Sequence, residues 1–399
     1  MATRLKAEPK HQRHARHGTR VVYGVVVDHK MWRLAAVFLQ QLRDVQSMLP
    51  AVVFNTSALP AAADVAIAAF GARRVSLEPP MPVPSIFVHP LSLSHGGIPA
   101  WTKLALWSQV EFEKIIYLDV DVLLLGNIDH MASFPGDTFS PEVCNFPPCD
   151  ESKTPAGINV GIMVIGPSLT RFGQLLEYTN RRAAHLELVA SNSNLSFAYG
   201  RRWLGSAEQS FLREFWEDAL NASIQEPNVQ RRGWNWTYAS YTEPRACERQ
   251  HERWRKERAR GETHSVSSPG VSAPPGTCEP GRVSVMSRRY NARPADCGRC
   301  PLESLRPLIV HYACTRKPHE EPRNNWLHLT WCRGRNDSVL CHPCLAEWTH
   351  KWYDAEDRMC DTLISAGATE SWRTVGACAD RPGARGRALA AHESHEPLL

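Results

Sequence analysis

The sequence feature that most constrains the fold is an apolar run interrupted by two acids, IIYLDVDVLLL at residues 115–125. Nine of its eleven residues are apolar, which is typical of a strand buried on both faces of a sheet. An unpaired carboxylate in such a place is costly, so Asp119 and Asp121 need partners. Side chains two residues apart on a strand point to the same side, so these two carboxylates, about 7 Å apart at Cα, can converge on one divalent cation.

Two interpretations of the Asp119-Val120-Asp121 tripeptide follow. In the first, Asp121 starts a turn and Asp119 pairs with a core arginine, since charged residues in a core are usually paired. In the second, both carboxylates bind a hard divalent cation, Mn²⁺ or alternatively Mg²⁺, because such ions prefer oxygen ligands. The tripeptide alone does not decide between them, although its apolar flanks favour the cation.

The order of the expected elements predicts an α/β fold. Apolar runs at 21–27, 51–54, 115–125 and 158–168 indicate strands, and they alternate with helical patterns at 31–45, 65–70, 101–112 and 168–188. Later patterns predict helices at 206–220 and 345–359 and a strand within 307–318, whereas residues 78–100 resemble a loop. Strands that alternate with helices are typical of a central, mostly parallel sheet.

Composition divides the chain into a leader, one domain and an extension. Residues 1–20 are basic and polar, and we expect them to be disordered. Residues 21–318 form the domain, within which 224–305 is charged and then rich in Ser, Pro and Gly, as in a flexible insertion outside the core. Residues 319–399 form a Cys- and Trp-rich extension with a disordered tail.

Twelve cysteines and five Asn-x-Ser/Thr sequons favour the Golgi or secretory lumen, where disulfides persist. No stretch reaches the roughly 18 apolar residues of a membrane helix, so no membrane anchor is visible. The N-terminus also lacks the apolar region of a signal peptide, so the cytoplasm is the alternative if that terminus is complete. Cys297-x-x-Cys300 and Cys341-x-x-Cys344 have zinc or redox spacing, but the 40 residues between them make disulfides the favoured interpretation.

The charge of the chain argues against nucleic acid as a partner. The formal net charge is +5, and Lys and Arg are not confined to one element. The basic run HERWRKERAR at 251–260 contains interleaved Glu, which is typical of a solvated charged helix or linker.

Other polar residues gain meaning only through their order along the chain. His311 ends the LIV strand six residues before Lys317; an imidazole can complete a metal site and an ammonium can contact a phosphate. Lys103 opens the helix that leads to the acidic strand, and Asn159 lies on a strand that Gly161 leaves open to a ligand. Each also has an ordinary structural explanation, such as a strand-end His, a solvated Lys or a satisfied core amide.

The successive blocks resemble those of the glycogenin-like retaining glycosyltransferases, the family-eight group with a GT-A fold that includes glycogenin, galactinol synthase and the plant xylan glucuronosyltransferases. WTKLALWSQVEFEKIIYLDVDVLLLGNID is similar to the T-K-L…D-x-D…N-I-D block, and INVGIMVIGPS to the F-N-[ST]-G…P-S strand. AEQSFL and HYACTRKP resemble the D-Q and H-[FY]-x-G…K-P-W segments. The resemblance implies transfer of a hexosyl or related unit, with retention, from a UDP-sugar to a carbohydrate, polyol or protein acceptor, with Mn²⁺ (or Mg²⁺) as cofactor.

The resemblance also implies a role for each matching residue. Metal ligands would be Asp119, Asp121 and His311. The UDP-sugar would be contacted by Val25, Val27, Asp28, Lys103, Asp119, Val120, Asn159, Val160, Cys314 and Lys317, and the reacting centre by Glu208 and Gln209.

Departures from the family pattern put the donor sugar and acceptor in doubt. Glu208 replaces an Asp, Cys314 replaces a Gly beside the phosphate Lys, and Val160 replaces a small Ser or Thr. The alternative is therefore a degenerate member of the fold that binds a nucleotide sugar or glycan without turnover.

Overall fold

The computed structural model describes residues 20–80, 101–141, 158–191, 209, 211–212, 215–216, 237–239, 284–294, 306–312, 343–367 and 378. An eight-stranded sheet forms its centre, in the order β3-β2-β1-β4-β7-β6-β9-β8. The strands are β1 (Val21–Val27), β2 (Ala51–Asn55), β3 (Arg73–Ser76), β4 (Lys114–Leu118), β6 (Thr138–Pro141), β7 (Ile158–Ile165), β8 (Thr237–Ala239) and β9 (Ser284–Met286). Only β7 runs antiparallel to its neighbours, β4 and β6, so the predicted α/β class with a mostly parallel sheet is confirmed.

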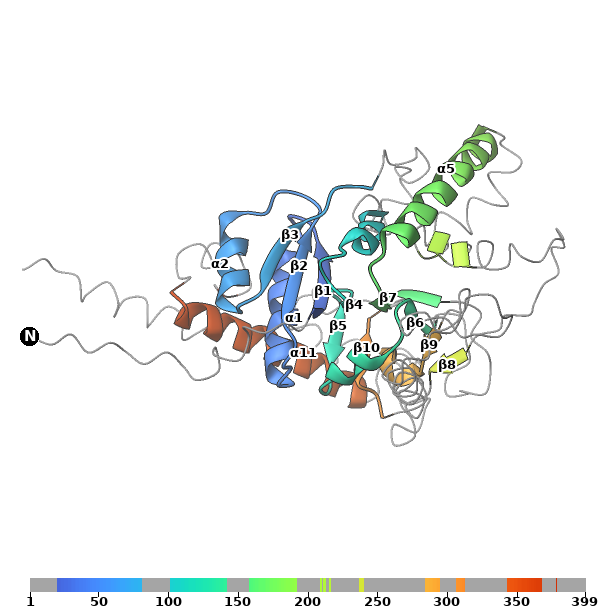
Figure 1. Cartoon of the computed structure of the whole chain (residues 1–399). Helices are drawn as coiled ribbons and strands as arrows, with labels where there is room; N and C mark the ends of the chain where they lie inside the picture. Colours follow the sequence, from blue (N-terminus) through green and yellow to red (C-terminus); the bar gives the residue numbers. More distant parts are fainter. Residues whose placement is uncertain are drawn as a thin grey trace, which may run out of the picture.

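Two apolar clusters cover the two faces of this sheet. Val25 and Val27 point into the first, together with α1 (Trp32–Asp44), α2 (Ala61–Ala69) and α11 (Pro343–Ser365). Val22 and Val26 point into the second, together with η3 (Lys103–Ser108) and α5 (Leu169–Ser191). Figure 1 shows α11 beside α1 and α5 on the other side of the sheet. All eight residues of β7 are buried, as predicted for a strand covered on both faces.

The acidic run is not one strand, which corrects the first expectation. β4 ends at Leu118, residues 119–121 form a turn, and β5 (Val122–Leu124) leaves the central sheet. β5 pairs instead with β10 (Ile309–His311) in a separate antiparallel sheet. The same-side argument for the two acids is therefore wrong, and the turn avoids placing two carboxylates in the middle of a buried strand.

The helix expected at 101–112 is also corrected. Residues 101–102 are helical, but η3 is a 3-10 helix that ends at Ser108, and Val110 is 44% exposed. The hydroxyl of Ser108 donates to the carbonyl of Ala105 at 2.7 Å, and the Gln109 amide donates to it at 3.3 Å. Side chains that bond the backbone in this way compete with continuation of a helix.

Part of the segment 224–305 belongs to the core, contrary to the prediction of an insertion outside it. β8 and β9 are strands of the central sheet, and η5 (Arg288–Tyr290) follows β9 directly. Asn291 and Ala292 are fully buried. The remaining domain boundaries stay predictions, and the leader at 1–19 lies outside the described residues.

The C-terminal extension contributes α11, which packs along α1. Arg358 forms an ion pair with Asp44 at 2.9 Å, and Thr362 donates to Gln40 Oε1 at 2.8 Å. A disulfide joins Cys360, in the last part of α11, to Cys378. The side chains of both predicted C-x-x-C pairs lie outside the described residues. Among the described helices, none is long and apolar enough to span a membrane.

Candidate metal centre

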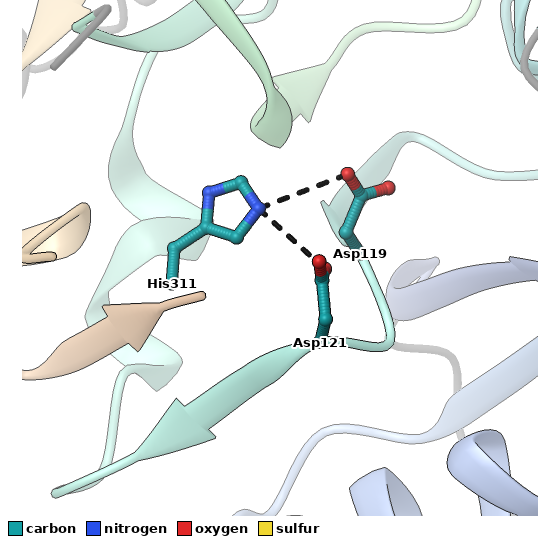
Figure 2. A group of neighbouring side chains, drawn as sticks. All are labelled: Asp119, Asp121 and His311. Carbon is teal, nitrogen blue, oxygen red and sulfur yellow. Dashed lines mark ion pairs between the residues drawn. The ribbon is translucent and has the colours of Figure 1, made fainter. Parts of the chain in front are cut away.

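Three predicted metal ligands meet where the two sheets join. Asp119 follows β4, Asp121 precedes β5, and His311 ends β10, which is paired with β5. Nε2 of His311 lies 3.5 Å from Oδ1 of Asp121 and 3.9 Å from Oδ2 of Asp119, and one ligand atom from each residue falls within 4.8 Å of the others. Figure 2 shows the three side chains pointing toward one another. The structure therefore brings together the three residues that the resemblance grouped, although the same-side strand geometry expected for the two acids was wrong.

The geometry and chemistry of this triad fit a divalent cation. Two ligand atoms that each lie about 2.1 Å from an ion are about 3 Å apart at right angles and about 4.2 Å apart on opposite sides. The 3.5 and 3.9 Å separations from Nε2 of His311 fall within that range. Two carboxylates and one imidazole suit a hard to intermediate ion such as Mn²⁺ or Mg²⁺. An added Cβ at Gly161 would lie 2.3 Å from Cε1 of His311 and 2.8 Å from Oδ2 of Asp119, so only glycine leaves room for the triad.

The carboxylate of Asp119 is oriented by two donors on one oxygen. Lys103 Nζ donates to Oδ1 at 2.9 Å, and the buried Tyr117 hydroxyl donates to the same atom. Burial and then the charge of Asp119 raise the pKa of Tyr117 well above its ordinary value, so the phenol stays a donor. With Oδ1 engaged, Oδ2 is the oxygen that faces His311. Of the first interpretation, the structure shows Asp121 in a turn and Asp119 paired with a basic residue, which is Lys103 rather than an arginine. The divalent cation of the second interpretation stays a proposal, to which the convergence with His311 lends support.

Of the other predicted residues on and near the strands, Asn159 lies on the side of β7 that borders the triad, whereas the side chains of Val160 and Val120 pack in the apolar clusters. Asn159, on β7, donates from Nδ2 to Oε1 of Gln209 at 3.1 Å and accepts a hydrogen bond from the Gly161 amide at 2.9 Å. Gln209 is therefore tied to the strand that borders the metal centre. Val160 points to the opposite side of β7 from Asn159, into the second apolar cluster. Val120 packs in the first cluster.

The residues at the end of β1 have structural roles of their own. The side chains of Val25 and Val27 are fully buried in the first cluster. Asp28 Oδ1 accepts hydrogen bonds from the amides of Lys30 (2.8 Å) and Met31 (2.9 Å), just before α1 begins. Their contact with a nucleotide stays a prediction. Glu208, Cys314 and Lys317 lie outside the described residues.

Two buried amides beside the centre were missed at the sequence level. Gln41, on α1, donates to the carbonyl of Val122 at 3.2 Å and accepts from the amide of Leu124 at 2.8 Å, and so it pairs with the backbone of β5 as a neighbouring strand would. Asn291 lies 3.0 Å from Nδ1 of His311. Asn291 was missed because it falls within 224–305, which the composition predicted to be an insertion. Gln41 was missed because nothing in the sequence distinguishes it from the other polar residues of an amphipathic helix.

Comparisons with known proteins agree with the resemblance. The chain is 28% identical over 117 residues to a putative UDP-glucuronate:xylan alpha-glucuronosyltransferase of Arabidopsis thaliana, covering 29% of this chain and 17% of that protein. It is 28% identical over 172 residues to galactinol synthase 5 of the same plant, with coverages of 36% and 50%. Mouse glycogenin-1 is 25% identical over 172 residues, with coverages of 37% and 46%. The chain thus spans half or less of the length of these curated relatives.

Solved glycosyltransferases also match, at low similarity. LgtC, as an active-site mutant, is 14% identical with a TM-score of 0.41, covering 84% of this chain and 95% of that chain. GlyE of Streptococcus pneumoniae is 15% identical with a TM-score of 0.39, covering 83% and 64%. No family model matches. Over 29–37% of its length, the chain is therefore similar in sequence to a plant xylan glucuronosyltransferase, a galactinol synthase and a glycogenin.

Proposed function

We propose that the protein is a GT-A glycosyltransferase that moves a hexosyl or related unit from a UDP-sugar to a carbohydrate, polyol or protein acceptor, with retention and with Mn²⁺ bound. The observation that carries this proposal is the convergence of Asp119, Asp121 and His311 within 4.8 Å at the carboxyl end of β4. Ligands of open α/β sheets bind outside the carboxyl ends of the strands. The glycosyltransferases among the sequence relatives support the same reaction class.

The leaving group of such a reaction is a nucleoside diphosphate, on which negative charge gathers as the glycosidic bond breaks. A bound divalent cation supplies positive charge where it develops. In this proposal the triad holds the cation, and Lys103 adds a second positive group from the side of Asp119. Lys317 would contact the diphosphate, and Asp28 with the β1 backbone would face the uracil.

The sugar side of the proposed site is organised by the Asn159–Gln209 contact. Asn159 is buried and bonds both the backbone at Gly161 and the side chain of Gln209, so its amide cannot turn freely. Gln209 is thereby held on the side of β7 that borders the triad. We assign Gln209 and its neighbour Glu208 to the reacting centre, where a carboxylate or amide would face the oxocarbenium-like sugar.

The test is calorimetric titration of UDP into the protein with Mn²⁺, then with EDTA, for the wild type and for Asp121→Asn. Micromolar binding that requires metal and is lost in the variant is expected. Asp64→Asn is the matched control, because it removes an exposed carboxylate far along the sheet at α2. Metal-independent binding, or no binding by folded protein, would contradict the proposal.

A second candidate is a degenerate member that binds a nucleotide sugar or glycan but does not turn over. The replacements at Glu208 and Cys314 favour it, since both change positions where the family pattern has a shorter acid and a glycine. Metal-dependent UDP binding without hydrolysis or transfer across a panel of UDP-sugars would favour this candidate. The Cys360–Cys378 disulfide supports the Golgi or secretory lumen as the location in either case.

A further inference from the structure

His311 is contacted by a buried amide on the side of the ring away from the acids. Nδ1 of His311 lies 3.0 Å from Oδ1 of Asn291, and Nδ2 of Asn291 donates to the carbonyl of Pro141 at 2.8 Å. We propose that Asn291 is a positioning residue that fixes His311 as the Nδ1–H tautomer and so leaves Nε2 free to bind the divalent cation. The metal-binding role of His311 in this inference rests on the proposed function, whereas the contacts of Asn291 do not depend on it.

The orientation of the Asn291 amide follows from its two partners. A backbone carbonyl can only accept, so the NH₂ group must face Pro141 and the amide oxygen must face His311. An amide oxygen can only accept in turn, which requires the proton on Nδ1. A neutral imidazole carries one N–H, so its Nε2 then presents a lone pair toward Asp119 and Asp121.

The opposite tautomer would leave buried polar groups unsatisfied. With the proton on Nε2, the bare Nδ1 would face the amide oxygen of Asn291, acceptor against acceptor. Turning the amide over would move the same conflict to the carbonyl of Pro141. Asn291 is 0% exposed and His311 is 3% exposed, so the protein itself must supply their hydrogen-bond partners. A buried group left without a hydrogen-bond partner is unfavourable, so these contacts select one tautomer.

Backbone contacts hold the two residues in this relation. The His311 amide donates to the carbonyl of Ala292 at 2.8 Å, and the Ala292 amide donates to the carbonyl of Ile309 at 3.1 Å. Pro141 is the last residue of β6, the strand that also pairs with β7 at Asn159. The chain of hydrogen bonds therefore runs from the central sheet through Asn291 to the metal centre, and it orients a metal-binding imidazole as outer-shell partners do in other metal sites.

The experiment has one readout without metal and one with it. ¹⁵N NMR of the imidazoles in metal-free protein is recorded at alkaline pH, so that the rings are neutral, and His311 is assigned from the spectrum of His311→Gln. The wild type is expected to show the Nδ1–H tautomer. Asn291→Leu, nearly the same in shape, should give a mixture of tautomers, and Asn291→Asp, which keeps the acceptor, should preserve Nδ1–H. Calorimetry should show Mn²⁺ affinity lowered about 10–100-fold in Asn291→Leu, the usual effect of losing an outer-shell partner.

Thr138→Val controls for destabilisation, because it deletes a buried hydrogen bond to the carbonyl of Pro135 without reaching His311. Its tautomer and Mn²⁺ affinity should match the wild type. An Nε2–H tautomer in the wild type, or unchanged Mn²⁺ affinity in folded Asn291→Leu, would overturn the inference while leaving the proposed function intact. A wild type with the Nδ1–H tautomer that binds no Mn²⁺ would instead overturn the proposed function and leave the tautomer assignment standing.

Discussion

Lys103 Nζ donates to Oδ1 of Asp119 at 2.9 Å, so this carboxylate is paired with the ammonium group of a lysine. Both side chains are partly buried, at 11% and 26% exposed, which makes the pair stronger than a surface ion pair. The pair lies on the opposite oxygen from His311. Lys103 can therefore orient the carboxylate and add positive charge without occupying the place of the metal ion.

Replacing Lys103 by Met separates these two effects. The loss of a charged donor near the proposed diphosphate should weaken UDP binding about 10–100-fold, the range that follows from a charged hydrogen bond. Mn²⁺ affinity should not fall by the same factor, because the lysine repels the ion as well as orienting its ligand. Separate calorimetric titrations with Mn²⁺ and with UDP test this.

Lys114→Met is the control for Lys103→Met, since Lys114 is also partly buried but donates to the backbone carbonyls of Ala132 and Phe134. It should cost stability and leave UDP affinity unchanged. The prediction is wrong if Lys103→Met abolishes Mn²⁺ binding as Asp121→Asn does.

Gly161→Ala should disrupt the metal centre through sterics alone. The added methyl would lie 2.3 Å from Cε1 of His311, so the imidazole must move away from Asp119 and Asp121. We expect Mn²⁺ affinity to fall at least tenfold, comparable to the loss of a residue that orients a metal ligand. In Gly173→Ala, by contrast, the new methyl on α5 meets nothing within 4 Å. That variant should bind Mn²⁺ normally and gain roughly 0.5–1 kcal/mol of stability, and equal Mn²⁺ affinities in the two variants would refute the steric argument.

Gln41→Leu tests whether α1 holds the strand that follows Asp121. The Gln41 side chain satisfies the Val122 carbonyl and the Leu124 amide, and both groups become unpaired in the variant. The expected cost is about 1–3 kcal/mol of unfolding free energy. Mn²⁺ binding should also weaken, because β5 follows Asp121 directly and pairs with β10, which carries His311.

Gln40→Leu is the neighbouring control for Gln41→Leu. Gln40 is equally buried but bonds Asp44 and Thr362, which join α1 to α11. It should lose stability by a similar amount without loss of Mn²⁺ affinity. If both variants bind Mn²⁺ as the wild type does, the backbone of β5 does not depend on Gln41.

The features of the fold that depend on the local pattern of apolar and polar residues could be predicted from the sequence. Apolar runs and helical periodicity were sufficient for the α/β class, because burial on a sheet or helix face leaves a repeat in the sequence. Resemblance to the family blocks, rather than spacing alone, grouped Asp119, Asp121 and His311, and the structure brings one ligand atom of each within 4.8 Å of the others. The N-I-D end of the resembling block proved to be structural: Asn127 donates to the carbonyls of Val45 and Gln46, and Asp129 accepts from Tyr23 and Met48.

Partners distant in the sequence could not be predicted in this way. Gln41 and the groups of β5 that it binds are 81 and 83 residues apart, and Asn291 and His311 are 20 apart. The periodicity of apolar residues in the sequence does not predict contacts of this kind. The break between β4 and β5 was missed for a related reason, since both halves are apolar and buried, although they belong to different sheets.

Asp137 should make the stability of the protein depend on pH. Its carboxylate accepts a hydrogen bond from Trp107 Nε1 at 2.7 Å and lies 3.5 Å from Arg171, yet burial outweighs both and raises its pKa from 3.8 to about 6. The folded state therefore holds a proton that the unfolded chain releases between about pH 4 and 6. Stability attributable to this group is fully present below pH 4 and is lost as the pH rises through 6.

Asp137→Asn removes this dependence and keeps the local shape. Asn retains an acceptor for Trp107 and tolerates the positive φ of 59° at this position. Because each pKa unit corresponds to about 1.4 kcal/mol, the wild type should lose roughly 3 kcal/mol relative to the variant between pH 4 and 7. Arg171 would keep its stacking on Trp216 at 4.4 Å and its bond to Gln174 in the variant. Denaturant unfolding of both proteins across this range measures the difference, and parallel stability curves would show that Asp137 is ionised throughout.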